Sequence, residues 1–519
     1  MDASWNGDTA TKINLGGASA AVEGTGAKSD KNIVTITASG TYVVSGSLHD
    51  GQIVIAATKD DAVQLVLNGA EITNKSGAGI YASQCDELTI TLAEGTKNTV
   101  TDGGSNFTYA NATDEEPNAA VFSKDDLTIN GTGSLTVNAG FNNGIGTKDD
   151  LVIASGAFIV SAANHGIRGN DSVTILGGDF TVTAGNDGIQ TNEGEDAEKG
   201  SIMIEGGSFT ITAGHDGIQS ENDLLISGGE FDVRAGGSAA AAQTDTTSDS
   251  YKGIKAAGDM EITAGTFVVD SADDSIHSNG NISIQGGAFI LASGDDGIHA
   301  DGSLHVSGGN VKVTRSYEGL EGANIDISAG TVSVAAADDG INAAGGADAN
   351  TGGGRFGADT FAAGGSYSIK ITGGEVVVYS GSDGLDSNGT LEVTGGTVAV
   401  FINAPRDGET TDVDRGGTIQ PALYVSSALK AGTKIAVGDI WSTTTEADAT
   451  SFCLMLPGVV NGQSYRITAN GSELAAVTAT TAVQGMMGGG NSGFAAGGGN
   501  AGGRTGSKPG RGTAPGTQY

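Results

Sequence analysis

Residues 288–309 read AFILASGDDGIHADGSLHVSGG, and this stretch of sequence decides the fold. Apolar and polar residues alternate in two short runs, and a glycine turn separates the runs. This is the pattern of short β-strands that bury one face. Very similar 22-residue stretches stand at 208–229, 266–287 and 375–396. The shared length and the shared turn indicate one structural unit that is used many times.

The turn glycine sets the period of the repeat. It stands at positions 144, 166, 188, 217, 253, 275 (here a serine), 297, 319, 340 and 384, and a column of Phe and Val residues from Phe158 to Val398 follows the same steps. Longer steps mark insertions at 192–200 and 237–251, and at 345–366, which is one degenerate coil or a long excursion. Strands whose like residues recur one unit later pair in parallel and in register. The sequence therefore predicts an all-β, right-handed parallel β-helix with about 22 residues per coil.

The chain divides into four predicted regions. The parallel β-helix is expected over residues 31–402, and residues 1–30 are expected to form an N-terminal cap or extension. Strand-like segments after residue 402 have a different spacing, which predicts a small C-terminal β module or cap over 403–484. Residues 485–519 are rich in Gly and contain no Asp or Glu, so we expect a flexible tail there.

The strong negative charge limits the partners of the protein. The formal net charge is -36, from 61 acidic against 25 basic residues, which excludes nucleic acid as a partner.

No apolar run is long enough to insert into a membrane. Met1 is followed by polar sequence without a signal peptide, so an extracellular location implies that the signal has been removed. Cys85 and Cys453 are expected to be buried or incidental thiols.

Acidic residues recur at the two positions before the turn glycine: both positions are acidic on three rungs, and one of them is acidic on four more. In-register stacking would place them about 4.8 Å apart, where two unit charges repel by about 3.5 kcal/mol at an effective dielectric constant of about 20. Calcium prefers such carboxylate and carbonyl oxygens, so several structural Ca²⁺ ions are predicted. The alternative is a solvated turn that favours Asp for its local hydrogen bonds. The predicted ligands are Asp187, Asp216, Asp273, Asp274, Asp295, Asp296, Glu318, Asp338, Asp339 and Asp383.

A second polar column stands two residues after the turn glycine. Its members are Arg168, Gln190, Gln219, Lys255, His277, His299, Glu321, Asn342 and Asp386. His277 and His299 suggest a transition-metal pair, but two ligands without a third are weak support for a metal site. We therefore expect the members of this column to be surface residues.

The repeat GGxFxVxAxxDGI and the phrase at 71–103 resemble the carbohydrate-binding-domain family of secreted clostridial and related bacterial proteins. The resemblance covers residues 30 to 480. It implies a pectate-lyase-like fold, calcium within the β-helix, and binding of cellulose and polygalacturonate at the cell surface. The family's calcium turns correspond to the Asp positions named above. Carboxylates are missing at Asn142–Asn143, Asn164–His165 and Tyr251–Lys252, which puts calcium at those rungs in doubt.

Three functions compete at this stage. The first is non-catalytic binding of a polysaccharide, cellulose or a pectin-type polyuronate, although aromatic platforms are scarce because Trp5 and Trp441 lie outside the repeats. A polyuronate would need bound calcium to bridge the two anions. The second is a structural protein that assembles with copies of itself, end to end, into filaments. The third is a polysaccharide lyase, for which Arg168 and Arg315 are the candidate bases.

Overall fold

The computed structural model describes residues 2–241, 250–344, 366–404 and 408–483. Within these ranges the chain is built from β-strands, with one 3-10 helix at Gly104–Asn106. No helix in these ranges has the length and apolar character to span a bilayer. The predicted tail at 485–519 and most of the predicted insertion at 345–366 lie outside the described residues.

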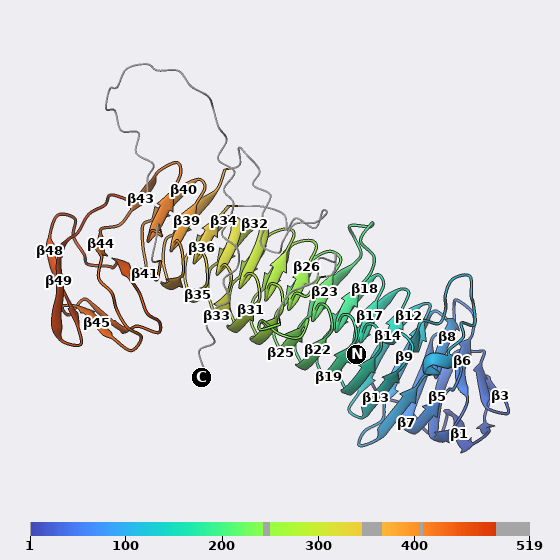
Figure 1. Cartoon of the computed structure of the whole chain (residues 1–519). Helices are drawn as coiled ribbons and strands as arrows, with labels where there is room; N and C mark the ends of the chain where they lie inside the picture. The colour runs from blue at the N-terminus through green and yellow to red at the C-terminus, as the bar shows by residue number, and fades with distance from the viewer. Residues whose placement is uncertain (1, 242–249, 345–365, 405–407, 484–519) are drawn as a thin grey trace. The chain divides into compact units, whose positions relative to one another are not determined.

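Successive coils stack as three parallel sheets, which we call the first, second and third sheets (Figure 1). The first sheet consists of β10 (Lys97–Thr101), β13 (Ser134–Ala139), β16 (Ala157–Ala162), β19 (Asp179–Ala184), β22 (Ser208–Ala213), β25 (Glu230–Ala235), β28 (Thr266–Ser271), β31 (Ala288–Ser293), β33 (Asn310–Ser316), β35 (Thr331–Ala336), β38 (Glu375–Ser380) and β41 (Thr397–Ile402).

The second sheet has shorter strands and follows the glycine turn. It consists of β8 (Ile80–Gln84), β11 (Ala119–Ser123), β14 (Asn143–Thr147), β17 (Ile167–Gly169), β20 (Ile189–Thr191), β23 (Ile218–Ser220), β26 (Ile254–Ala256), β29 (Ile276–Ser278), the first parts of β32 (Ile298–Val306) and β34 (Leu320–Ile327), β36 (Ile341–Ala343), β39 (Leu385–Ser387) and β42 (Thr411–Val413).

The third sheet closes each coil. It consists of β9 (Glu87–Leu92), β12 (Asp126–Gly131), β15 (Asp150–Ile153), β18 (Ser172–Ile175), β21 (Ser201–Ile204), β24 (Leu224–Ile226), β27 (Met260–Ile262), β30 (Ile282–Ile284), the last parts of β32 and β34, β37 (Ser368–Ile371), β40 (Thr390–Val393) and β43 (Gly417–Ile419). The parallel pairing thus continues past residue 402 to Ile419.

The two ends of the stack depart from the regular coil. At the N-terminal end, β1 (Thr11–Gly17), β5 (Gly40–Leu48) and β7 (Val63–Thr73) pair in parallel, as do β4 (Ile33–Ile36), β6 (Gln52–Ala56) and β8. The short strands β2 (Ala20–Glu23) and β3 (Ala27–Asp30) pair antiparallel with β1 and β4. At the C-terminal end, β47 (Ser451–Met455) pairs antiparallel with β41 and with β44 (Ala422–Val425).

A small antiparallel sheet completes the C-terminal region. It contains β46 (Trp441–Thr444), β45 (Lys434–Val437), β48 (Ser464–Ala469) and β49 (Ser472–Thr478) in that order. The predicted parallel β-helix with a small C-terminal β module is therefore confirmed. Cys85 and Cys453 are both buried free thiols, as expected.

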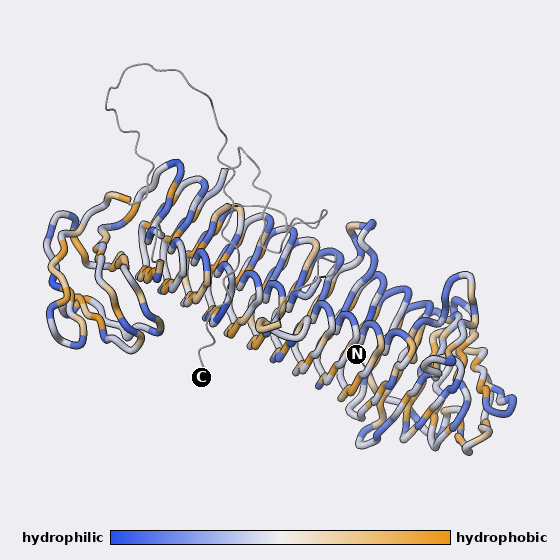
Figure 2. The backbone as a smooth tube through the Cα atoms, in the orientation of Figure 1, coloured by the Kyte–Doolittle hydropathy of each residue, from blue (hydrophilic) through white to orange (hydrophobic). Residues whose placement is uncertain are grey.

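Like residues stack on like residues inside the helix. Figure 2 shows hydrophobic and hydrophilic segments recurring at corresponding places in successive coils. The rings of Phe158, Phe180, Phe209, Phe231, Phe267 and Phe289 form one continuous stack, with neighbouring centroids 4.6 to 4.9 Å apart. Because pairing is in register, each residue type keeps one lateral position on every rung. The outward turns therefore also bring like residues together.

Candidate functional site

The turns between the first and second sheets form the acidic ladder, by which we mean the two residues before each turn glycine. In this ladder the carboxylate before the glycine accepts a hydrogen bond from the backbone of the next rung. Asp274 Oδ1 accepts from the amide of Asp296 at 2.9 Å, and Asp296 Oδ1 accepts from the amide of Glu318 at 3.2 Å. The same bond links Asp187 to Asp216 and Asp339 to Asp383, at 3.0 and 2.9 Å. One oxygen of each of these four carboxylates is therefore held by the fold.

The turn glycine brings the rungs this close. A Cβ atom at Gly297 would lie 2.5 Å from the carbonyl oxygen of Gly319 and 2.7 Å from a methyl group of Val313. Such distances are below van der Waals contact, so a side chain at this position would push the next rung away. The predicted local hydrogen bonding of Asp and the predicted close stacking of acids thus occur together.

Lys252 supplies a cation to the rung that follows it. Its ammonium group lies 2.8 Å from Asp274 Oδ2 and 3.0 Å from Asp273 Oδ2, and the lysine is 5% exposed. Burial raises the pKa of Asp274, but Lys252 and His277 outweigh it and hold that pKa below its ordinary value. The rung at Tyr251–Lys252 lacks carboxylates, and its lysine occupies the place beside Asp273 and Asp274 where a metal cation was predicted.

Earlier rungs also pair their acids with basic side chains. His165 Nδ1 lies 3.0 Å from Asp187 Oδ2. Lys255 Nζ is 3.6 Å from Asp216 Oδ2, and this aspartate is fully buried. Burial raises the pKa of Asp216, although Lys255 opposes the shift. Basic groups of the protein thus stand beside the predicted ligands Asp187 and Asp216.

The polar column after the turn was predicted to lie on the surface, and this was wrong for Gln190, His277, His299, Glu321 and Asn342, which are all buried. Parallel pairing in register places His277, His299, Glu321 and Asn342 on successive strands at the same position, so the side chains of this column stack on one another. The rings of His277 and His299 stack with centroids 4.9 Å apart and an interplanar angle of 23°. Two buried histidines therefore face the acidic ladder.

His299 connects three acidic side chains. Its Nδ1 lies 3.1 Å from Asp296 Oδ2 and 3.2 Å from Glu321 Oε2, and its Nε2 lies 3.1 Å from Asp301 Oδ1. Burial and the nearby Glu321 charge raise the pKa of Asp296 well above its ordinary value. Burial alone would lower the pKa of His299, but the hydrogen bonds to its three acidic partners raise it well above 6.5.

The ladder changes character toward its C-terminal end. Oxygens of Asp339, Asp383 and Asp386 lie within 4.8 Å of one another. Burial, followed by the neighbouring carboxylates, raises the pKa of Asp339 to about 7 and that of Asp386 to about 8. Within the described ranges no Lys, Arg or His forms an ion pair with these three residues. We call them the carboxylate triad, and their oxygen-only donor set fits calcium.

The predicted ligands thus fall into separate groups. Asp273, Asp274 and Asp295 lie within 4.8 Å of one another, as do Asp339 and Asp383 in the carboxylate triad. Glu318 Oε2 accepts a hydrogen bond from Asn342 Nδ2 at 2.7 Å. Asp187, Asp216 and Asp338 belong to none of the groups of three found in the described residues. The assignment of calcium to all of these residues stays a prediction.

Sequence reasoning set His299 aside as a metal ligand because no third ligand was apparent, and it did not name Glu321 or Asp386, which also belong to groups of three potential ligands. Each stands two residues after the turn glycine, so the period that revealed the ladder also placed them beside it. It also missed Asp126, Asp149 and Asp150, which come from two neighbouring coils and lie within 4.8 Å of one another. Burial and the neighbouring Asp171 raise the pKa of Asp149 to about 6.

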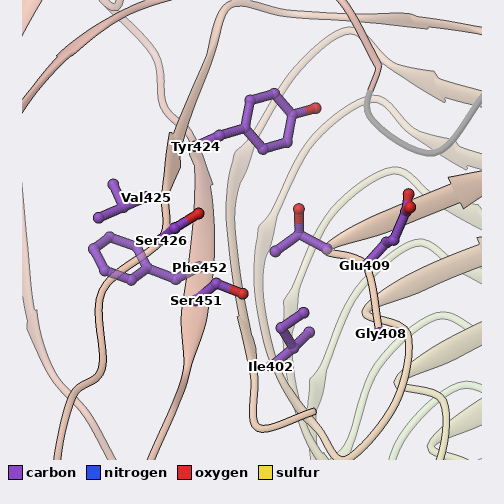
Figure 3. A pocket seen from close by; sticks show the side chains of 9 residues that line it. Ile402, Gly408, Glu409, Tyr424, Val425, Ser426, Ser451 and Phe452 are labelled. Carbon is purple, nitrogen blue, oxygen red and sulfur yellow. The ribbon is translucent and has the colours of Figure 1, made fainter. Parts of the chain in front are cut away.

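A pocket of about 400 Å³ lies between the last coils and the C-terminal strands (Figure 3). Its polar lining includes Glu409, Thr410, Tyr424, Ser426 and Ser451. Glu409 Oε2 and Thr410 Oγ1 are buried without a hydrogen-bond partner. Phe452 and Ile402 contribute apolar walls.

The sequence is similar to carbohydrate-binding domain-containing proteins. A family model described as carbohydrate-binding domain-containing protein matches residues 30–297 and 295–450. A carbohydrate-binding domain-containing protein of Acetivibrio thermocellus is 45% identical over 129 residues, which are 25% of this chain and 45% of that protein. The match therefore spans less than half of that relative. The solved structure of a polysaccharide lyase-like protein from C. thermocellum, a gadolinium derivative, shows 31% identity and a TM-score of 0.40, covering 57% of this chain and 96% of that one.

Proposed function

We propose that this chain, which belongs to the family of carbohydrate-binding domain-containing proteins, binds an acidic polysaccharide of the polyuronate type through calcium. The family supports a polysaccharide partner. The observation that carries the calcium step is the carboxylate triad, where three neighbouring aspartates have no basic partner in the described chain. A dication there would remove the repulsion among the three carboxylates and present positive charge to a uronate.

The surface of the stack supports binding of a long polymer. Outward residues of β19, β22 and β25 are exposed on alternate positions, and they are mostly Thr, Ser, Asp and Glu. In-register stacking repeats these hydrogen-bonding groups at intervals of about 4.8 Å. A regular polysaccharide carries hydroxyl groups at regular intervals, so one contact can be repeated along the ladder of strands. Cellulose is the alternative ligand, and it would use these groups without calcium.

We propose that binding occurs without cleavage. Lyase chemistry needs a basic side chain close to a calcium-bound uronate. Arg315 is exposed, and Arg168 lies in β17, many coils before the carboxylate triad. Neither arginine forms an ion pair with the triad within the described ranges. We further propose an extracellular location at the cell surface, in keeping with the resemblance to secreted bacterial proteins.

End-to-end assembly with further copies of the chain stays a separate prediction. The last strand of the first sheet, β41, is paired with β47 and so has no open edge for another copy. Any such assembly would have to use the other two sheets or the N-terminal end.

The test compares binding to polygalacturonate and to cellulose in calcium and in chelator. We expect polygalacturonate binding that needs millimolar calcium and that falls at least tenfold in Asp386→Asn. The matched control is Asp60→Asn, because Asp60 is an exposed aspartate outside the ladder. Equal binding by both variants, or binding that persists in chelator, would reject the calcium step. Release of unsaturated uronate products, followed by ultraviolet absorbance, would reject non-catalytic binding.

A further inference from the structure

His299 is fully buried, and its ring lies between the carboxylates of Asp296, Asp301 and Glu321. Its Nδ1 lies 3.1 Å from Asp296 Oδ2 and 3.2 Å from Glu321 Oε2. Asp296 is 5% exposed and Glu321 is 1% exposed. Three ligand-type atoms, one nitrogen and two oxygens, therefore meet at one buried point.

The partner of Nε2 determines which ring nitrogen carries the hydrogen when His299 is neutral. Nε2 lies 3.1 Å from Asp301 Oδ1, an acceptor, so the neutral ring places its hydrogen on Nε2 and donates to Asp301. The lone pair of Nδ1 then points at two carboxylate oxygens. That arrangement is repulsive unless a proton or a metal cation lies between the three atoms, so a dication here would take the place of the proton that otherwise links Nδ1 to Asp296. A carboxylate that fixes the outer nitrogen of a histidine is also the usual second contact of a metal-bound imidazole.

A comparison with His277 shows why the cation at His299 is not supplied by lysine. His277 Nε2 lies 2.8 Å from the amide oxygen of Asn279, and its Nδ1 lies 2.9 Å from Asp274 Oδ2. The same Asp274 oxygen is 2.8 Å from Lys252 Nζ, so an ammonium group already occupies that position. One coil later no Lys or Arg of the described chain forms an ion pair with Asp296.

We propose that His299, Asp296 and Glu321 bind one transition-metal dication of the zinc class. Bond lengths of about 2.0–2.1 Å in a tetrahedral site place ligand atoms about 3.3 Å apart, and the observed separations are 3.1 and 3.2 Å. The imidazole ligand selects zinc over calcium, which takes oxygen ligands. Asn342, in register with Glu321 on the next rung, has a buried Oδ1 without a partner, which is available to a water in the fourth position.

This site is separate from the carboxylate triad. The triad contains only oxygen donors, whereas the His299 site contains an imidazole nitrogen. The chain would then hold two kinds of dication at different rungs of one ladder. The zinc site does not depend on polysaccharide binding.

The test uses the full chain, stripped with chelator and then dialysed against zinc or cobalt in the presence of millimolar calcium. We expect one tightly bound zinc per chain, and visible absorption bands from four-coordinate Co²⁺. The variants His299→Gln and Glu321→Gln should bind zinc at least tenfold more weakly. His305→Gln is the control, because His305 is a half-exposed histidine in the third-sheet part of β32, six residues after His299.

Each result decides the proposal. Absence of stoichiometric zinc binding by the folded wild-type chain overturns it without any variant. Retention of zinc by His299→Gln and Glu321→Gln also overturns it, provided that their circular dichroism matches the wild type. If one variant fails to fold, the other variant and the Co²⁺ spectrum of the wild type still decide. Displacement of the metal by calcium alone would show that the site is a calcium site.

Discussion

The ammonium group of Lys252 lies 2.8 Å from Oδ2 of Asp274, one coil further along the helix. A lysine on one rung thus neutralises acids on the next, and both side chains are buried. The negative charge is therefore compensated differently along the stack: lysine and histidine side chains lie beside the acids of the middle rungs, whereas the carboxylate triad near the C-terminal end has no basic partner in the described residues. Each part predicts a different response to mutation, pH and metal.

Replacement of Lys252 by Met should destabilise the protein strongly. Removing one partner of a buried ion pair leaves the remaining charge uncompensated, at a cost of about 3–5 kcal/mol. Urea unfolding followed by circular dichroism measures the loss. Lys59→Met is the control at an exposed position and should change stability by less than about 0.5 kcal/mol. If calcium can enter the vacated place beside Asp273 and Asp274, millimolar calcium should restore part of the loss; equal stability of both variants would refute this role of Lys252.

Stability in chelator should fall as the pH rises from about 4 to 8. The folded-state pKa values of Asp339 and Asp386, about 7 and about 8, lie above the value of 3.8 expected in the unfolded chain. The folded state then binds more protons, so this contribution is complete below pH 3.8 and is lost as the pH rises through 8. Melting temperatures at several pH values, with EDTA and with calcium, test this prediction.

Calcium should flatten that pH dependence, because it stabilises the ionised triad. Asp386→Asn should flatten it in chelator as well, since the amide does not ionise. A pH profile of Asp386→Asn that matches the wild type would show that the triad is not responsible.

The phenylalanine stack should be sensitive to truncation in its middle. Phe267 is fully buried between the rings of Phe231 and Phe289. Phe267→Ala should cost about 3–5 kcal/mol, because burial is lost and a cavity remains. Ile290→Ala on the outer side of the same sheet is the control, since Ile290 is 52% exposed. The difference in urea midpoint between the two variants is the measurement, and similar midpoints would contradict the packing argument.

Gly297→Ala should weaken the contact between two rungs. The new methyl group would meet the carbonyl oxygen of Gly319 at 2.5 Å. Overpacking of this kind costs about 1–3 kcal/mol. Gly177→Ala is the control, because the nearest atom there would be 3.8 Å away. Hydrogen exchange of the backbone amides of residues 297 and 319 should be faster than in the wild type in Gly297→Ala, and unchanged in Gly177→Ala.

The repeat was predictable from sequence because the fold enforces a strict period. The coils place Phe or Val, Ile or Leu, and a turn residue that is almost always Gly at fixed offsets, so the column from Phe158 to Phe289 revealed both the strands and their register. The acidic ladder followed from the same columns. The predictions were therefore most successful where a residue's role depends only on its offset within the unit.

The ion pairs of Lys252 and His299 could not be predicted from the offsets of these residues within the repeat. Whether a polar side chain after the turn is exposed depends on how it packs against neighbouring side chains, and this is not encoded by the period. His277 and His299 were expected on the surface, but they stack on each other and against Asp274 and Asp296. The cation at each rung depends on which basic residue an adjacent rung carries, so the sequence alone predicted calcium at every rung with carboxylates, including those beside Lys252.

In-register stacking also makes the length of the protein adjustable by whole coils. Removal of residues 266–287, one repeat, would place β31 directly on β25, with Phe289 over Phe231 and Ile298 over Ile254. Lys252 would then face Asp296 in place of Asp274. A lineage can lose or gain such a module by recombination between repeats, and the shortened chain would still pair a lysine with the first acidic rung after it.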